Sequence, residues 1–390
     1  MPAASERIQQ ISESDLEGWE VYVEAKSRIR CGEEIIMLAI GDHDFDTPSQ
    51  SVAACKTALD DGRHNYTAIQ GEPGLLEAIA KVSTAASGVD VTTNQVVAVP
   101  GGQAGLYAAM QAVLNPGDHV IVISPHYVTY PGTIRSAGGE FTLVEALPEN
   151  GFQPTADAIS NAIQENTKAV LINSPNNPTG TIYSKETLDK LAQVCIDKDL
   201  WLISDEVYWA LSMGNHVSPL SLPQMRQRTI VVQSMSKSHG MTGWRIGWLI
   251  APEEMIYYLT QHNLVSNYGM CDFISTAAVA ALNGEFGVTE IADRYQQRGE
   301  VFRSAIADAT DLIPISPSGG MYIMLDVRSI APNTEKFAFD LLSEKKIAVM
   351  PGESFGPSTA GHIRISLCQS KTKLREAATR LSEFSSNYSQ

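Results

Sequence analysis

The amino-acid sequence predicts an α/β protein: a large domain with a mostly parallel seven-stranded sheet flanked by helices, and a smaller α+β domain. Three observations lead to this prediction. With 390 residues, 44% of them hydrophobic, the chain is long enough for two domains and can bury a sizeable core. Short β-branched segments alternate with helical patterns through its middle. The last third changes to long helical segments with few strands.

The strands expected in the large domain begin with the apolar segment VVAV. In order, they lie at 96–99, 119–124, 141–146, 168–174, 200–206, 229–236 and 246–252. Helical patterns lie between them, at 101–114, from Tyr127 onward, near 154–165 and at 184–198. Because strands that alternate with helices form βαβ units, we expect a largely parallel sheet. Ligands of such sheets bind beyond the carboxyl ends of the strands.

The last third predicts the smaller domain. Long helical segments are expected at 252–266, 271–283 and 288–309. They lead into the strand-like stretches GGMYIMLDV, IAVMPG and HIRISL, which are separated by one helix and followed by another. We therefore expect residues 46–289 to form the large domain, and residues 1–45 together with 290–390 to form the small one.

Charge and cysteine content argue against several classes of protein. The formal net charge of -16 disfavours nucleic-acid binding, which usually requires a basic face. The five cysteines are scattered without CxxC spacing, so neither a disulfide framework nor a metal site is predicted. The N-terminal segment is polar and acidic, unlike a targeting peptide, and no apolar run approaches the roughly 20 residues of a membrane span. We expect a soluble, cytoplasmic protein with no membrane partner.

Polar clusters follow the predicted strands of the large domain. The turn PGGQAG after 96–99 offers free backbone N–H groups to a phosphate, although such turns are common. It matches neither GxGxxG nor GxxxxGK[ST], which argues against a dinucleotide fingerprint and a P-loop. Three later strands lead into SPNNPTG, DEVY and SMSK. Taken singly, these clusters have ordinary explanations, namely a turn, a helix cap and a solvated lysine.

Lys237 is the most informative residue in these clusters. Small residues flank it after an apolar strand, so we expect it to be enclosed. A desolvated lysine beside other positive charge has a lowered pKa and can attack a carbonyl carbon. Nearby serines and an arginine suit a phosphate, and a carboxylate suits a protonated ring nitrogen. Together these groups meet the needs of pyridoxal 5'-phosphate (PLP), which is held through a lysine and an acidic partner.

At this point the sequence resembles a known family. The motifs NSPNNPTG, DEVY and SxSKSHGMTGWRIGW, in this order, are similar to those of the class I/II aminotransferases of PLP fold type I, the aspartate aminotransferase superfamily. GDHDFDTP, YTAIQGEPGLLEAI and HIRISL match as well, so the resemblance covers essentially the whole chain. It implies a homodimeric PLP enzyme that transfers an amino group from an L-amino acid to a 2-oxo acid. The implied kinetics are ping-pong, through an aldimine on Lys237.

The resemblance also implies roles for individual residues. Lys237, Asp205 and Tyr208 are the implied catalytic residues, with Lys237 as proton shuttle, Asp205 on the ring nitrogen and Tyr208 on the ring hydroxyl oxygen. The implied cofactor-binding residues are these three and Gly102, Gln103, Tyr127, Asn177, Ser234, Ser236, Arg245 and Tyr66, the last reaching the active site of the neighbouring subunit. The implied substrate-binding residues are Gly41, Asn177 and Arg364, with Arg364 binding the α-carboxylate bidentately.

The amino donor is less clear from the sequence. Members that take dicarboxylates often read GGKQAL in the glycine-rich turn, whereas here Gln103 stands in place of the lysine. Between Lys237 and Arg294 the only arginine is Arg245, so a distal arginine is also missing and aspartate specificity is disfavoured. PHYVTYPG, DLWLISDEVY and GESFGPSTAGHIR resemble arginine–pyruvate transaminases. The acidic candidates for binding a guanidinium are Asp42, Asp44 and Asp272, although each could equally be a solvated surface group.

Several alternatives stay open at this stage. His43 replaces the usual proline of GxPDFDTP, which leaves open how this loop closes over substrate. Aspartate-, aromatic- or alanine-type transamination, or another PLP reaction such as β-elimination, would use the same lysine, aspartate and arginine. A ligand-sensing module without activity is a further alternative, and the absence of GxGxxG argues against a nicotinamide enzyme.

Overall fold

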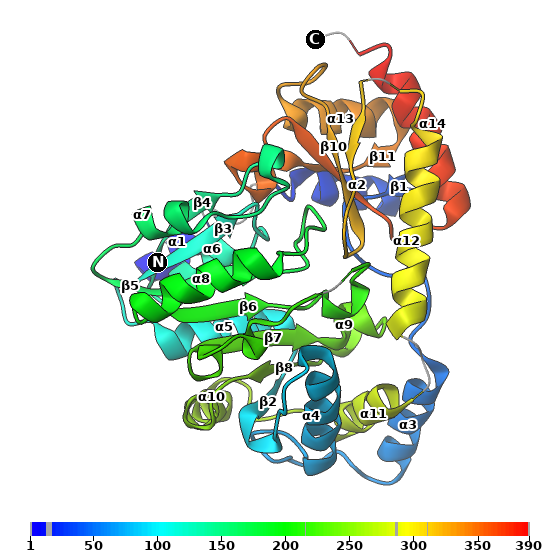
Figure 1. Ribbon diagram of the computed structural model, residues 1–390. Coiled ribbons are helices and arrows are strands. Elements are labelled where there is room, and N and C mark those ends of the chain that lie inside the picture. The colour runs from blue at the N-terminus through cyan, green and yellow to red at the C-terminus, as the bar shows by residue number, and fades with distance from the viewer. Residues whose placement is uncertain (1, 13–17, 215, 285–287, 310, 389–390) are drawn as a thin grey trace.

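A seven-stranded sheet forms the centre of the larger part of the molecule, and a four-stranded sheet lies in a smaller part above it (Figure 1). These features come from a computed structural model that describes residues 2–12, 18–214, 216–284, 288–309 and 311–388. The predicted fold class, a mostly parallel α/β sheet with helices plus a smaller α+β unit, is confirmed. Within the described residues, no helix has both the length and the apolar character needed to cross a membrane.

The large sheet has the strand order β2-β8-β7-β6-β5-β3-β4. Its strands are β2 (Val96–Val99), β3 (His119–Ser124), β4 (Glu140–Glu145), β5 (Thr167–Asn173), β6 (Trp201–Asp205), β7 (Thr229–Ser234) and β8 (Gly247–Ile250). Only β8 runs antiparallel to its neighbours, while the pairs from β7 to β4 are parallel. Six of these strands are largely buried because helices cover both faces of the sheet, whereas the edge strand β4 is mostly half-buried or exposed. Because β5, β6 and β7 run parallel, their carboxyl ends lie together at one end of the strands, which we call the carboxyl edge of the sheet.

Helices pack on both faces of this sheet. One face is covered by α5 (Gly102–Val113), α6 (Tyr130–Ser136) and α10 (Glu253–Ser266), the other by α7 (Ala156–Asn161) and α8 (Lys185–Asp197). Beyond β2 and β8 lie α3 (Ser49–Asp60), α4 (Pro73–Ser87) and α11 (Asp272–Asn283), as Figure 1 shows. Local signals begin these helices: the Ser184 hydroxyl accepts from the Thr187 N–H to cap α8.

The smaller part combines segments from both ends of the chain. Its sheet has the order β12-β13-β10-β9, all antiparallel. Its elements are α2 (Glu20–Arg30), β1 (Ile36–Met37), α12 (Val288–Ala305), β9 (Ile313–Ile315), β10 (Tyr322–Asp326), α13 (Thr334–Lys345), β11 (Ile347–Ala348), β12 (Met350–Pro351), β13 (His362–Ser366) and α14 (Lys371–Ser385). The strand β1 pairs in parallel with β11, which joins the N-terminal segment to the C-terminal one. The exact domain boundaries stay a prediction.

The structure differs from the sequence-based expectation in a few elements. The strand expected through Ser236 ends two residues earlier, because the Ser234 hydroxyl accepts from the Ser236 N–H and caps a short helix, α9 (Met235–Ser238). Lys237 therefore lies on a helical turn rather than on a strand end. The helices α1 (Glu6–Ser12), α2, α3 and α4 and the strands β1 and β9 were not expected.

Buried histidines make the stability of this fold depend on pH. Burial lowers the pKa of both His126 and His239 to about 4. Because the neutral ring is favoured in the folded state, the stability this gives is fully present above about pH 6.5 and is lost as the pH falls through about 4. We expect His239→Gln to reduce the slope of the unfolding free energy against pH by up to about 1.4 kcal/mol per pH unit between about pH 4 and about pH 6.5.

Urea unfolding at a series of pH values measures this slope. The exposed His64 offers a matched control, since His64→Gln should leave the slope of the parent protein unchanged. Equal slopes in the parent and in His239→Gln would contradict the prediction.

Candidate active site

A cavity of about 410 Å³ lies at the carboxyl edge of the large sheet, where residues of the smaller part close over it. Its lining comes from the turns after β2, β5, β6 and β7 and from residues 40–42, Tyr322 and Arg364. Most of the predicted site residues contribute to this lining: Gly41, Gly102, Gln103, Tyr127, Asn177, Asp205, Tyr208, Ser234, Ser236, Lys237, Arg245 and Arg364. Tyr66 does not.

Lys237 projects from α9 into the cavity. Its Nζ donates a hydrogen bond of 2.5 Å to the carbonyl of Gly41, in the loop that leads in from the smaller part. Burial lowers the pKa of Lys237, and the positive charges of Arg364 and Arg245 lower it further, while Asp42 acts in the opposite direction. A lysine in these surroundings is deprotonated more readily than a solvated one, so its amine can act as a nucleophile or a base.

Asp205 ends β6 and is 3% exposed. Its Oδ2 accepts from the Tyr130 hydroxyl at 2.6 Å, and its Oδ1 accepts from the Val207 N–H at 3.1 Å. Burial nevertheless raises the pKa of Asp205 to about 6. Within the described parts of the chain, no ion pair neutralises this carboxylate. A protonated ring nitrogen at this position would stabilise its charged form.

Asn177 and Tyr208 connect the large-sheet edge to Arg364. The Arg364 Nη1 donates to Asn177 Oδ1 at 2.8 Å, and Asn177 Nδ2 donates to the Tyr208 hydroxyl at 3.3 Å. The Tyr208 and Tyr322 hydroxyls lie 3.3 Å apart. This network orients an amide and two phenols at the cavity wall.

Arg364 is a buried guanidinium without an acidic partner. It is 2% exposed, its Nη2 donates to the Ala39 carbonyl at 2.6 Å, and its Nε has no hydrogen-bond partner. The guanidinium carbon lies 4.2 Å from the ring centroid of Tyr322 and 4.7 Å from that of Phe355. Among the residues that the structure describes, no carboxylate pairs with Arg364. A buried charge of this kind suits a carboxylate ligand, which would occupy the free donor.

The turn between β2 and α5 forms another wall. Gly101 has a φ of 91°, and a Cβ on it would lie 2.2 Å from Arg245 Nη2, so only glycine allows this approach. The first turn of α5 leaves backbone N–H groups free at Gly102 and Gln103. Arg245 Nη1 donates to the Thr242 carbonyl at 2.8 Å and lies 3.5 Å from Ser236 Oγ. Such a concentration of donors suits a phosphate.

The predicted phosphate ligands Ser234 and Gln103 have other partners in this structure. Ser234 Oγ accepts from the Ser236 N–H and lies 2.9 Å from the Ile246 carbonyl, so its hydroxyl would have to change partner to reach a phosphate. The Gln103 side chain is held by Thr129 and Thr133, each at 2.8 Å. Its contribution to a phosphate would come from the backbone.

These observations fit PLP. The buried carboxyl of Asp205 and the glycine-lined turn at Gly101 offer complementary groups for the pyridinium and the phosphate of PLP, and the guanidinium of Arg364 offers one for the carboxylate of an amino-acid substrate. The individual roles of these residues stay predictions.

Tyr66 lies outside the cavity. Its side chain is 87% exposed, and its ring centroid is 5.0 Å from that of Tyr268. Its role at a neighbouring subunit's phosphate stays a prediction.

Three residues that contact or line the site were not predicted: Tyr322 and Trp19, which line the cavity, and Tyr130, which lies behind it. Tyr130 binds Asp205, Tyr322 stacks on Arg364, and Trp19 lines the cavity from the N-terminal segment. PHYVTYPG holds a second tyrosine beside Tyr127, and GGMYIMLDV places Tyr322 directly after two glycines and a methionine, so both were weakly signalled. No local pattern signals Trp19.

Of the three acidic candidates for a guanidinium, only one lines the cavity. Asp44 pairs with Arg298 at 2.8 Å, and Asp272 pairs with Arg63 at 2.6 Å. Asp42 lines the cavity and accepts a hydrogen bond of 2.8 Å from the Thr242 hydroxyl. Unlike the other two acids, Asp42 forms no ion pair among the described residues, so its negative charge is available to a basic ligand.

Comparisons with known proteins agree with this geometry. Residues 33–381 match the family described as aminotransferase class I and II. The chain is 40% identical to the arginine–pyruvate transaminase of Pseudomonas aeruginosa, over 97% of this chain and 96% of that protein. It is 36% identical to the aspartate/prephenate aminotransferase of Thermus thermophilus, over 90% and 91%. A double mutant of Thermus thermophilus aspartate aminotransferase has a similar structure, with a TM-score of 0.92, 35% identity, and coverage of 98% of this chain and 100% of that one.

The raised pKa of Asp205 predicts an unusual effect on stability. Because burial favours the neutral carboxyl, the cost of ionising it is present above about pH 6 and absent below about pH 4. We expect Asp205→Asn to stabilise the cofactor-free protein by up to about 2–3 kcal/mol near pH 8, and by less near pH 5. Thermal unfolding at both pH values measures the difference.

Glu206, the next residue, provides a matched control. It is also buried, but its carboxylate accepts from Ser204, Ser218 and Gln233 and faces His216. Glu206→Gln should therefore destabilise the protein at both pH values. An Asp205→Asn variant that is less stable near pH 8 than the parent would contradict the prediction.

Proposed function

The chain belongs to the class I and II aminotransferases, and on this basis we propose that it transfers the amino group of arginine to pyruvate or a related 2-oxo acid. It is an enzyme, a PLP-dependent transaminase by its family. The observation that carries the proposal is the convergence of Lys237, Asp205 and Arg364 on one cavity whose rim presents Asp42. Lys237 and Asp205 suit the cofactor, and Arg364 suits the α-carboxylate of the substrate. Asp42 suits a basic side chain on that substrate.

The groups of the cavity divide between the cofactor and the substrate. Asp205 would hold the ring nitrogen in its protonated form, and Asn177 and Tyr208 would hydrogen-bond the ring hydroxyl oxygen. The turn at Gly102 with Arg245 would bind the phosphate. When bound, PLP supplies an aldehyde for a primary amine and a ring that delocalises the electrons left by a departing proton.

Lys237 would then move the proton. Its Nζ, kept reactive by burial, would take the proton from the substrate Cα and hold it for return. Arg364, fixed by Asn177 and Ala39, orients the substrate through its α-carboxylate. Release of the first 2-oxo acid before the second binds gives ping-pong kinetics.

Charge at the cavity favours a basic donor over a dicarboxylic one. The cations that line it, within the described residues of this chain, are Lys237, Arg245 and Arg364, and each is already assigned to cofactor or α-carboxylate. Gln103 is neutral and held by Thr129 and Thr133. The similarity to an arginine–pyruvate transaminase supports the same choice.

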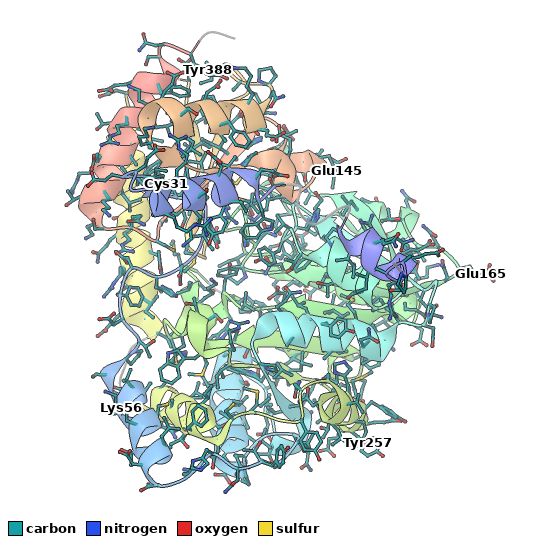
Figure 2. The ribbon with its side chains drawn as sticks, turned by 180° about the vertical axis from the view of Figure 1, so that it is seen from behind. Cys31, Lys56, Glu145, Glu165, Tyr257 and Tyr388 are labelled. Atoms are coloured by element: carbon teal, nitrogen blue, oxygen red, sulfur yellow. The ribbon has the colours of Figure 1, made fainter. Side chains whose placement is uncertain are left out.

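We also propose a homodimer and a cytoplasmic location. Exposed apolar and aromatic side chains gather on α10 and the following loop: Tyr257, Tyr258, Leu264, Val265 and Tyr268. Figure 2 shows Tyr257 at the outer surface. Together with the exposed Tyr66, such a patch suits a subunit interface. The five cysteines are unpaired, which suits a reducing compartment.

Absorbance of the purified protein tests the main proposal. With PLP bound through Lys237, the spectrum should show a band near the visible edge that an amino acid bleaches as a 2-oxo acid forms. Lys237→Ala should lose this band and reduce turnover by at least about 10²–10⁴-fold, the usual contribution of proton transfer. A variant that keeps both band and turnover would contradict the role of Lys237. A β-elimination enzyme would instead release product without bleaching.

Steady-state kinetics with two donors test the substrate. Asp42→Asn should lower kcat/KM for arginine about 5- to 20-fold, the loss of one charge-assisted contact, and leave kcat/KM for alanine nearly unchanged. Asp46→Asn is the matched control, because Asp46 is an exposed acid of the same loop that does not line the cavity. Equal losses for arginine and alanine would contradict a role for Asp42 in specificity.

A further inference from the structure

His43 occupies a position between the reactive lysine and the smaller part of the molecule. Its Nδ1 lies 2.7 Å from the Tyr295 hydroxyl on α12, and its Nε2 lies 3.1 Å from the carbonyl oxygen of Ser236. That carbonyl belongs to the peptide bond that precedes Lys237. Two residues before His43, the Gly41 carbonyl accepts from Lys237 Nζ. The segment 41–43 therefore contacts both the backbone and the amine of Lys237.

The hydrogen-bond partners determine which ring nitrogen carries the proton. A carbonyl oxygen can only accept, so Nε2 must donate to Ser236. In the neutral ring Nδ1 then accepts from the Tyr295 hydroxyl. The Tyr295 oxygen also lies 3.5 Å from Cys368 Sγ, whose thiol donates to Met321 Sδ at 3.7 Å. The bonds thus run in one direction from Tyr295 through His43 to Ser236.

The charges around His43 also favour the neutral ring. Burial lowers the pKa of His43 to about 4, and the nearby Lys237 acts in the same direction. The hydrogen bond to Ser236 and the charges of Asp42 and Asp44 oppose this lowering of the pKa but do not overcome it, and Asp44 is paired with Arg298. The ring is therefore neutral through the range in which the enzyme would work.

The same loop is tied to α12 at two further points. Asp44 pairs with Arg298 at 2.8 Å, and the guanidinium of Arg294 lies 4.3 Å from the ring centroid of Phe45. These contacts hold the loop to α12 but do not reach α9. Of the three loop residues that contact α12, only His43 also forms a hydrogen bond to the turn that carries Lys237. A proline at position 43 could make neither hydrogen bond.

We propose that His43, neutral and protonated on Nε2, is a positioning residue that locks the loop 41–44 onto the Ser236–Lys237 peptide and so holds the Lys237 amine in its reactive orientation. The role of the amine rests on the proposed function, whereas the bond from His43 to Ser236 does not. A residue that only filled space would be replaceable by any side chain of similar size.

Hydrogen exchange of the cofactor-free protein tests whether His43 joins the two segments. His43→Ala should speed amide exchange in peptides covering 41–47 and 235–240 by about 10-fold, the effect of losing a buried hydrogen bond. His43→Gln, whose amide can donate to Ser236 and accept from Tyr295, should restore most of the protection. Asp44→Asn, the matched control, should speed exchange in 41–47 alone. Unchanged exchange at 235–240 in His43→Ala would overturn the anchoring.

The rate at which the cofactor-free protein captures added PLP, followed by absorbance, tests the effect on Lys237. We expect capture to be about 10-fold slower in His43→Ala, within about 3-fold of the parent in His43→Gln, and unchanged in Asp44→Asn. Tyr295→Phe should lie between parent and His43→Ala. Capture by His43→Ala at the parent rate would overturn the positioning role. A parent that captures no PLP would overturn the proposed function instead, and the exchange data would still decide whether His43 holds the segments together.

Discussion

Two opposite charges, Asp205 and Arg364, are buried in one cavity without pairing with each other, and the site depends on this separation. In surroundings of low dielectric, unlike charges attract strongly and an unpaired one is costly. Each is held in place by fixed partners: Asp205 by Tyr130 and a backbone N–H, Arg364 by Asn177, a carbonyl and two aromatic rings. Both therefore keep unsatisfied capacity that a zwitterionic substrate and a charged cofactor can use.

This arrangement joins the two parts of the molecule. Arg364 lies on β13 of the smaller sheet, Asn177 follows β5 of the large sheet, and Ala39 belongs to the N-terminal segment. Lys237 adds a contact from α9 to Gly41 in that same segment. Because every contact crosses between segments distant in sequence, a displacement of either part would disturb substrate orientation and the lysine together.

The sequence predicted the sheet, most of its helices and many of the residues that line the cavity, because strand periodicity and polar residues after strands are local signals. Residues that act through tertiary contacts were missed. Tyr130 reaches Asp205 across 75 positions, and although PHYVTYPG shows a second tyrosine near Tyr127, no local pattern indicates that it contacts Asp205. The end of β7 was misplaced because the Ser234 hydroxyl begins a helix where the apolar run suggested continued strand. The role of Tyr66 at a neighbouring subunit stays a prediction.

Substrate preference has to come from the rim of the cavity rather than from its buried groups. Arg364 would bind the α-carboxylate and Lys237 would take the Cα proton, and all amino-acid donors share these groups. Their strong interactions therefore cannot discriminate among donors. Discrimination is left to exposed residues such as Asp42, whose charge is partly screened by water and engaged by Thr242. A solvent-exposed acid separates basic from neutral side chains by only modest factors. On these grounds the enzyme would prefer a basic donor while still accepting smaller ones, and its rejection of dicarboxylates would come from repulsion by Asp42 and the neutrality of Gln103.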